Sequence, residues 1–411
     1  MVEKKIVTPE DIDKFMNGRD PMERIVNLEY SYRDDFIRVY YRDENDNKHI
    51  KQEGFYPFLW ATKKACRALC DGKKSEIRRY LLEYGISCTG LDTTNTKGEV
   101  VEEMENGYTV MFRAMKPMSY SRFLDFFKRC GNPVYTDKKK KSSPDSFMNQ
   151  TPEEKERSRQ YLVVTPKEQY LISTGKRFFK GYDDYNCCLR MIFDLETTGL
   201  DTRKDRIEQF GIWFNRPVKY KGKDMEFHKI YDVSGNTKKE LDDSELKNIR
   251  NFLKIIYTFR PDIITAHNGE SFDWNIIIGA CERLGTSLEN ESRPYFDGET
   301  IHKDQKETIL KLGGEIEKFN KTIVPGCIVT DSLHAVRRAQ AIDSNMQEAN
   351  LKYVTKYSKM EKPDRVYVPG DKISTIYNDY KEHYAFNDED GDWYIYNPDY
   401  EAANISDKRG K

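Results

Sequence analysis

The chain has 411 residues and a mass of 48.5 kDa, enough for two or three globular units with buried cores. Its 68 basic and 69 acidic side chains nearly cancel, so any nucleic-acid site must be a local feature. The eight cysteines include no C-x-x-C pair and no apolar leader is present, which predicts reduced thiols in a cytoplasmic protein without a zinc site or disulfide frame. The apolar runs fall far short of the ~18 residues that a spanning helix needs, which excludes a membrane protein.

The first 136 residues are predicted to form a β-rich α+β domain. Apolar alternation at 24–32 and 36–41 is typical of paired strands, and a turn-forming run separates these from an apolar segment at 55–60. Three further elements are predicted: a helix at 77–84, a strand at 108–113 and an amphipathic helix at 119–130 that Ser121 could cap.

Residues 137–186 interrupt this pattern and are predicted to be a basic linker and connecting segment. Across 137–180 there are eleven basic and six acidic residues, a net charge of +5. The run Lys138–Lys141 is typical of a solvated loop, and its contact with phosphates stays a hypothesis.

From residue 187 to residue 378 the chain alternates apolar strands with amphipathic helices, which predicts an α/β domain with one sheet and helices packed against it. The tail 379–411 carries nine acidic and four basic residues, a net charge of −5, and is predicted to be irregular. The predicted elements are strands at 188–193, 207–214, 226–231 and 263–266, and helices at 241–256, 272–284, 332–340 and 346–357.

Two carboxylates lie at the end of the first strand of this domain, in the run Met-Ile-Phe-Asp194-Leu-Glu196-Thr-Thr-Gly. Residues two apart on a strand point to the same face, so Asp194 and Glu196 are expected side by side. Two like charges in that position are costly without a cation, and a hard divalent ion such as Mg²⁺ or Mn²⁺ suits oxygen ligands. A strand end that reaches solvent is the alternative explanation.

A second polar run follows the strand 263–266, with the sequence His-Asn268-Gly-Glu-Ser-Phe272-Asp273. Asp273 opens the next helix, where an acidic residue is favourable by itself, Asn268 suits a turn, and Ser271 is expected to cap the helix. Two strands of one sheet that both end in acidic or amide residues predict a functional site at that edge.

These two runs resemble the first and second exonuclease motifs of the proofreading domain of family B DNA polymerases, in the bacteriophage-like branch. Weaker similarity extends to Ile328–Leu333 and Glu348–Thr355, and upstream to Gly54–Trp60 in the family's N-terminal domain. The resemblance implies a ribonuclease H-like exonuclease domain behind the N-terminal domain. The chain is expected to be an N-terminal piece of such a polymerase or a split gene product, because the palm motifs would lie downstream.

By this resemblance the reaction is two-metal hydrolysis of the 3′-terminal phosphodiester of DNA, with two Mg²⁺ or Mn²⁺ ions as cofactors. Asp194 would contact both metals, Glu196 the metal on the nucleophile side and Asp273 the metal on the leaving-group side. A single-stranded or frayed 3′ end would be the substrate, because a paired terminus must first be unstacked. The implied partners are therefore DNA and the remaining palm, fingers and thumb of the polymerase. The residues implied to hold the terminal nucleotide are Asn268, Phe272 and the backbone from Leu195 to Thr197.

The family also needs a fourth carboxylate in a Tyr-x-x-x-Asp motif on a helix, and Tyr384 with Asp388 is a formal match. The same stretch, begun at His383, fits the His-x-Ala-x-x-Asp variant of free-standing exonucleases. Turn-forming residues around it favour an exposed loop, so a third motif beyond Lys411 is the main expectation. Two alternatives stay open: a free-standing exonuclease completed by Asp388, and a non-catalytic nucleic-acid-binding or docking module. The expected location is the cytoplasm, that of the host if the protein is of phage origin.

Overall fold

The structure is a computed structural model, and it divides into two compact units, Met1–Gly181 and Tyr182–Lys411. In the part of the chain that it describes, no helix has both the length and the apolar character to cross a membrane. The expected helix at 77–84, the run Lys138–Lys141 and the third-motif candidates Tyr384 and Asp388 lie outside the described residues. The described residues are 18–30, 36–62, 65, 86–90, 110–114, 117–130, 161–162, 164–312, 315–361, 385–387, 393–395 and 409–410.

The first sheet of unit 1 is an antiparallel meander of β1 (Ile25–Tyr30), β2 (Phe36–Arg42) and β3 (Lys48–Gly54), in the order β1-β2-β3. The expected turn lies between β2 and β3, where the Asp43 carboxylate accepts the backbone N–H groups of Asn45 and Asn47. The strand β3 was not predicted, because its sequence KHIKQEG lacks apolar alternation.

The second sheet of unit 1 is antiparallel, with the order β5-β6-β4-β7. A cluster of buried aromatic residues, which includes Phe112, Phe123 and Phe127, joins it to α3. Because α3 begins at Pro117, Ser121 lies inside the helix and does not cap it, contrary to the prediction. The elements are β4 (Phe58–Ala61), β5 (Ile86–Gly90), β6 (Val110–Ala114), β7 (Tyr161–Leu162) and α3 (Pro117–Cys130).

Residues 161–181, which the sequence placed in the connecting segment, belong to unit 1. The helix α5 (Pro166–Thr174) begins at a capping box of Thr165 and Glu168. Tyr170 is 1% exposed in the core around β1, and the side-chain carbonyl of Gln169 accepts the Phe58 N–H at 2.7 Å. This stretch therefore closes the first unit.

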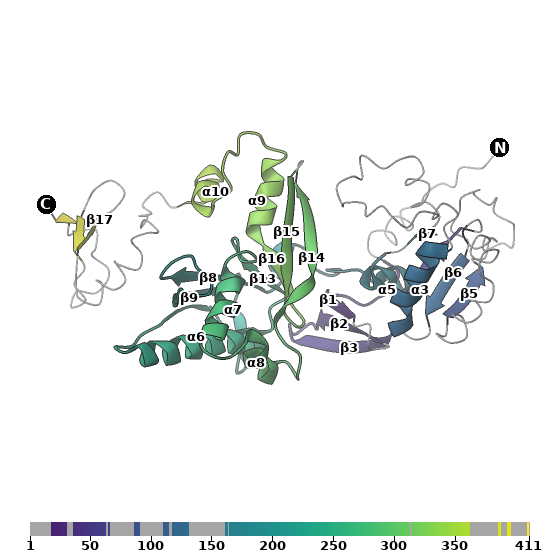
Figure 1. The fold of residues 1–411 in the computed structure, drawn as a ribbon, viewed down its shortest axis with the longest axis horizontal. Coiled ribbons are helices and arrows are strands. Elements are labelled where there is room, and N and C mark those ends of the chain that lie inside the picture. Colours follow the sequence, from purple (N-terminus) through teal and green to yellow (C-terminus); the bar gives the residue numbers. More distant parts are fainter. Residues whose placement is uncertain are drawn as a thin grey trace. The chain divides into compact units, whose positions relative to one another are not determined.

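Unit 2 is built on a five-stranded mixed sheet with the order β12-β9-β8-β13-β16 (Figure 1). The central strand β8 pairs in parallel with β13 and antiparallel with β9, and β13 pairs in parallel with β16. The carboxyl ends of β8, β13 and β16 therefore meet at one edge of the sheet. The strands are β8 (Arg190–Thr197), β9 (Ile207–Phe214), β12 (His228–Asp232), β13 (Ile263–Ala266) and β16 (Ile328–Asp331).

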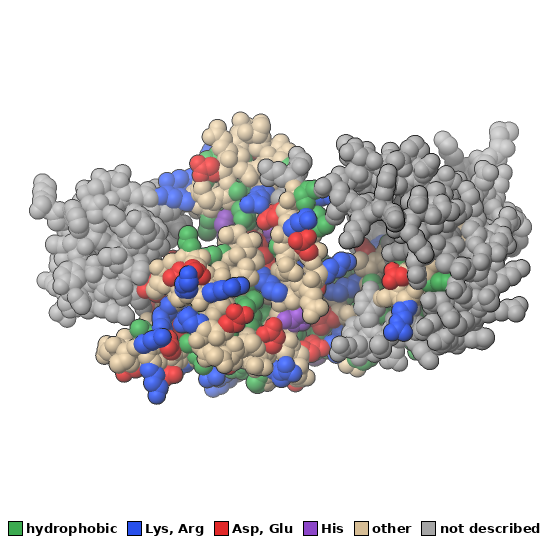
Figure 2. Space-filling model, in the orientation of Figure 1, with side chains coloured by type: hydrophobic (Ala, Val, Ile, Leu, Met, Phe, Trp, Pro, Cys, Tyr) green, Lys and Arg blue, Asp and Glu red, His purple; other side chains and the backbone are tan. Residues whose placement is uncertain are grey.

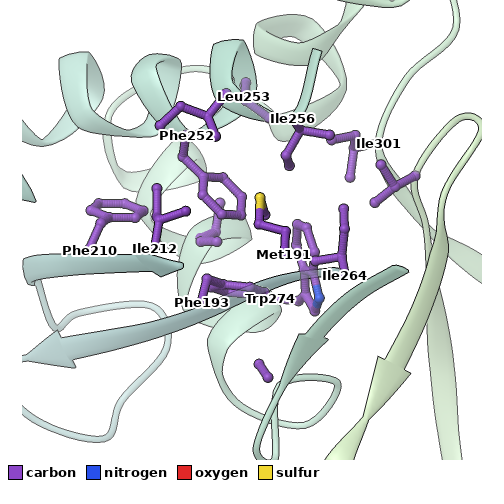
Figure 3. Packing of buried hydrophobic residues seen from close by; sticks show 14 of the residues in the cluster. Met191, Phe193, Phe210, Ile212, Phe252, Leu253, Ile256, Ile264, Trp274 and Ile301 are labelled. Atoms are coloured by element: carbon purple, nitrogen blue, oxygen red, sulfur yellow. The ribbon is translucent and has the colours of Figure 1, made fainter. Parts of the chain in front are cut away.

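One face of this sheet is covered by the helices α6 (Lys238–Phe259) and α7 (Asp273–Arg283). Figure 3 shows Phe252, Leu253 and Ile256 of α6 packed over apolar side chains of the strands, with Trp274 of α7 among them. Three buried aromatic rings meet there in tilted and edge-on contacts: Phe193, Phe252 and Trp274. This core fixes the start of α7 against β8, which matters for the site.

A long antiparallel hairpin of β14 (His302–Leu312) and β15 (Glu315–Ile323) extends beside β16 and α9 (Figure 1). The helix α9 (Ser332–Gln340) contacts it through an ion pair between Arg337 and Glu317 at 2.6 Å. The helix α10 begins at Leu351 and not at 346 as predicted, because Asn350 caps it. The remaining elements of unit 2 are η1 (Tyr185–Cys187), β10 (Val218–Tyr220), β11 (Lys223–Met225), α8 (Leu288–Ser292), η2 (Arg293–Tyr295), α10 (Leu351–Tyr357), β17 (Ala385–Asn387), β18 (Trp393–Ile395) and β19 (Arg409–Gly410).

Candidate active site

The strand β8 delivers Asp194 and Glu196 to the face of the sheet opposite the helices. Its alternate residues Met191, Phe193 and Leu195 are buried in the core, so the carboxylates between them must point the other way. The prediction that Asp194 and Glu196 share a face is confirmed. The chain bends directly after the strand, where the Thr197 hydroxyl donates to the Gly199 carbonyl at 2.6 Å.

The loop from β13 to α7 brings Asp273 to the same place. Asp273 is the first residue of α7 and is 2% exposed, and its carboxylate accepts a hydrogen bond from the Leu195 backbone N–H. The side chain at the start of α7 therefore meets β8 between its two carboxylates. Ser271 does not cap the helix as predicted: Phe272 occupies the N-cap position and makes no side-chain cap hydrogen bond.

The three carboxyls have raised pKa values, and burial is the main cause for each. The pKa of Asp273 rises to about 7 because the group is buried and because the charges of Asp194 and Asp331 lie nearby. The charge of Asp194 also raises the pKa of Glu196, as does Glu208. Asp194 keeps some exposed surface, but the protein around its carboxyl removes water from it and so raises its pKa. The Leu195 backbone and the charge of His267 oppose this rise. Asp194 thus lies close enough to both Glu196 and Asp273 for its charge to disfavour their ionisation.

Asp331, at the end of β16, was not among the predicted site residues. Its Oδ1 accepts the Asn268 N–H at 2.8 Å and its Oδ2 accepts the Glu270 N–H at 3.0 Å, while Oδ1 also caps α9 through the Leu333 N–H at 2.9 Å. The side chain therefore holds the loop that leads to Asp273. The available signal was its place directly after a short apolar strand, which is the same signal that singled out Asp194.

The residues predicted to hold the terminal nucleotide differ in how deeply they are buried. Asn268 is half-buried with a positive φ of 67°, a conformation that asparagine adopts more readily than most residues. Phe272 is half-buried and packs against the core of unit 2. The Leu195 side chain lies in that core, so its backbone N–H, bonded to Asp194 and Asp273, is the part that faces the carboxylates.

A divalent cation fits the chemistry of this donor set, although a complete coordination site is not formed. Among the described residues, no group of three or more His, Cys, Asp or Glu side chains is placed to hold a metal ion. The charge of Asp194 nonetheless raises the pKa values of Glu196 and Asp273, and a hard cation such as Mg²⁺ or Mn²⁺ held by these oxygen donors would relieve that repulsion. Asp194, Glu196 and Asp273 are the residues that would hold it.

The mixed sheet, its flanking helices and the acidic residues at neighbouring strand ends define a ribonuclease H-like exonuclease domain. Residues 146–354 match the family model described as the exonuclease domain of DNA polymerase family B. The chain belongs to this family, and the region that precedes the match is rich in β-strands.

A solved structure of the family B DNA polymerase from the hyperthermophilic archaeon Pyrobaculum calidifontis has a similar fold, with a TM-score of 0.51 at 14% identity. The match covers 87% of this chain and 42% of that one, so the present sequence spans less than half of the archaeal protein. At this identity the likeness concerns the fold alone. No curated protein matches the sequence.

Proposed function

We propose that the chain is the 3′–5′ proofreading exonuclease portion of a family B replicative DNA polymerase. The observation that carries the proposal is the meeting of Asp194, Glu196 and Asp273 at one edge of the sheet, each with a raised pKa. Membership of the family and the match to its exonuclease domain support the same activity. The substrate would be the 3′-terminal phosphodiester of DNA.

The carboxylates act by holding divalent metal ions, for which Mg²⁺ or Mn²⁺ is the best chemical fit. Bound metal ions would activate a water molecule and stabilise the leaving 3′ oxygen. Asp194, Glu196 and Asp273 would hold these ions: Asp194 would serve both, Glu196 would act on the side of the attacking water and Asp273 on the side of the leaving group. Because Asp273 has a pKa of about 7, a cation competes with a proton at this carboxyl near neutral pH.

The terminal nucleotide would be held beside the carboxylates by residues of the same two segments. The Asn268 amide is available for a polar contact, and the half-buried Phe272 ring offers an apolar surface. A single-stranded or frayed end should be required, since a paired base must be unstacked before its phosphate reaches the metals. On the face shown in Figure 2, basic and acidic side chains of unit 2 are interspersed. We assign DNA recognition to the local edge that carries the carboxylates.

The test is trimming of a 5′-labelled single-stranded oligonucleotide by the purified chain with Mg²⁺ or Mn²⁺. We expect a ladder of products shortened from the 3′ end, lost in EDTA and in the Asp194→Ala/Glu196→Ala variant. Arg250→Met is the matched control, because it removes an ion pair with Glu291 at 52% exposure elsewhere in the same unit. DNA binding without trimming, even after the palm, fingers and thumb of the polymerase are added, would refute the proposal and favour a non-catalytic module.

The role of the third-motif candidates is a separate proposal. If the chain is a self-sufficient exonuclease, Asp388→Asn should abolish trimming as fully as Asp194→Ala. If the fourth carboxylate comes from elsewhere in the polymerase, the chain should trim fully only when that part is added, and Asp388→Asn should then leave trimming unchanged. Comparing the initial rates of the two variants decides between these possibilities.

A further inference from the structure

A second buried polar cluster adjoins the catalytic loop and takes no part in the chemistry proposed above. Its centre is Glu270, which is 4% exposed. The Glu270 carboxylate accepts the Thr322 backbone N–H at 3.0 Å and the Thr322 hydroxyl at 2.6 Å. The Lys303 ammonium donates to this carboxylate at 2.9 Å and to the Glu270 backbone carbonyl at 2.8 Å.

Burying the charges of this cluster costs free energy, and both oxygens of the Glu270 carboxylate accept hydrogen bonds. A buried ion pair often contributes no more stability than apolar side chains of similar volume would, because both charges must leave water. Its advantage over an apolar contact is direction, since hydrogen bonds to a charged group fix the position of both partners. Glu270 accepts hydrogen bonds through both its side chain and its backbone carbonyl, and these bonds fix the position of the backbone at this residue.

The partners of Glu270 sit at the root of the β14–β15 hairpin. Lys303 and Thr322 are paired directly across the two strands, and the register shifts immediately beyond them, between Lys303 and Glu307. The irregular stretch separates the root of the hairpin from the regular arm that follows. The root of the hairpin therefore differs in structure from the arm. Its residues Lys303 and Thr322 donate hydrogen bonds to Glu270, in the loop between β13 and α7.

The Asp331 side chain also holds this loop, through hydrogen bonds to its backbone. Asp331 accepts the N–H groups of Asn268 and Glu270, while Lys303 and Thr322 hold the carboxylate of Glu270. Glu270 is thus fixed between the end of β16 and the root of the hairpin. It lies two residues from Asn268 and from Phe272, and three residues before Asp273.

We propose that Glu270, clamped by Lys303 and Thr322, is a positioning residue for the exonuclease reaction. The clamp fixes the loop that sets Asn268, Phe272 and Asp273 against the carboxylates of β8. It also ties the placement of this loop to the root of the β14–β15 hairpin. The inference rests on the proposed function, since it assigns Glu270 to the support of that site and not to contact with the reacting atoms.

The kinetic test compares Glu270→Gln and Lys303→Met with the wild-type chain on single-stranded DNA with Mg²⁺. Loss of positioning should lower kcat by about 100-fold while KM for the oligonucleotide changes little, because small misplacements act on the chemical step. Lys303→Arg, which keeps the charge and the donors, should restore most of the rate. The double variant Glu270→Gln/Lys303→Met should lose no more than the worse single variant, because both changes break the same clamp. Arg250→Met is again the control and should retain wild-type kcat.

Amide hydrogen exchange decides the positioning independently of activity. The N–H groups of Asn268 and Glu270 donate to the Asp331 carboxylate, and that of Phe272 donates to the Asn268 carbonyl, so all three report on the placement of the loop. We expect exchange over 268–273 to be at least about tenfold faster in Lys303→Met and Glu270→Gln, with α6 unchanged. Should Glu270→Gln fail to fold, the Lys303→Met and Lys303→Arg pair gives the same comparison.

The outcomes separate the two proposals. Unchanged exchange over 268–273 in both variants would overturn the clamp, whatever happens to kcat, as would a wild-type kcat in both. A wild-type chain that does not trim DNA, even with the rest of the polymerase added, would refute the proposed function alone, because the exchange data would still show whether Glu270 holds the loop.

Discussion

Replacing Asp273 by asparagine should stabilise the protein at alkaline pH when no divalent metal is present. The Asp273 carboxyl is 2% exposed and its pKa is raised from 3.8 to about 7 by burial and by the charge of Asp194. In the unfolded chain the same group ionises near its ordinary value. The ionised side chain therefore opposes folding, whereas asparagine keeps the shape and can still accept the Leu195 N–H without a charge.

The size of the effect follows from the difference between the two pKa values. A difference of about 3, at about 1.36 kcal/mol for each pH unit, corresponds to about 4 kcal/mol as an upper figure. The folded state of the wild type binds more protons than the unfolded state between these pKa values, so its stability falls as the pH rises from about 4 to about 7. The asparagine side chain cannot titrate, so the advantage of Asp273→Asn should be small near pH 4 and largest above pH 7.

Urea unfolding of both proteins in EDTA, at about pH 5 and about pH 8, measures this difference. Millimolar Mg²⁺ should then stabilise the wild type and not Asp273→Asn, because a cation relieves the charge that the substitution removes. Asp343→Asn is a control of opposite sign: the Tyr357 hydroxyl lowers the pKa of this exposed carboxyl, so its loss should not stabilise the protein at high pH. An equal difference between wild type and Asp273→Asn at both pH values would refute the reasoning.

Two further predictions concern residues that support the site. Glu245→Gln should lower the free energy of unfolding by roughly 3 kcal/mol, because the substitution leaves Arg283 and Arg206 without their buried counter-charge. In the wild type both oxygens of the fully buried Glu245 carboxylate accept hydrogen bonds from Arg283, at 2.7 and 2.8 Å. Urea unfolding measures the difference, and a change within error would contradict the prediction. Asp331→Ala should lower the free energy of unfolding by about 3 kcal/mol, because it removes the cap of α9 and leaves the Asn268 and Glu270 N–H groups unbonded. Amide exchange that becomes faster only in α9 would show that the loop does not depend on Asp331.

The elements that the sequence predicted best are those with an uninterrupted local signal. The strands β9 and β13 and the helix α9 have the predicted bounds, because each combines a clear apolar pattern with polar or turn-forming flanks. The β14–β15 hairpin was missed because the segments HKDQKETILKL and EIEKFNKTI are mostly polar on both faces. A strand that buries neither face leaves no periodic trace in its sequence.

The same distinction separates the site residues that were predicted from those that were not. Asp194, Glu196 and Asp273 could be found locally, since each lies at the end of an apolar strand or at the start of a helix. Glu270 and Asp331 act through partners 52 and 61 residues away in the chain. Only the fold brings these partners together. The strand-end position of Asp331 could therefore mark it as a candidate site residue, but no local pattern could assign Asp331 or Glu270 a supporting role.

Three buried acidic residues of unit 2 differ in the charge of their neighbours, and the contrast bears on what the site binds. Glu245 and Glu270 each have a cation within 3 Å, Arg283 and Lys303 respectively. Asp273, as deeply buried, instead has neighbouring carboxylates that raise its pKa together with that of Glu196. The fold supplies counter-charges to Glu245 and Glu270, whereas the charge of Asp194 disfavours ionisation of Glu196 and Asp273. An external cation would relieve that repulsion. The metal dependence expected of the exonuclease thus follows from where the chain places its own positive charges.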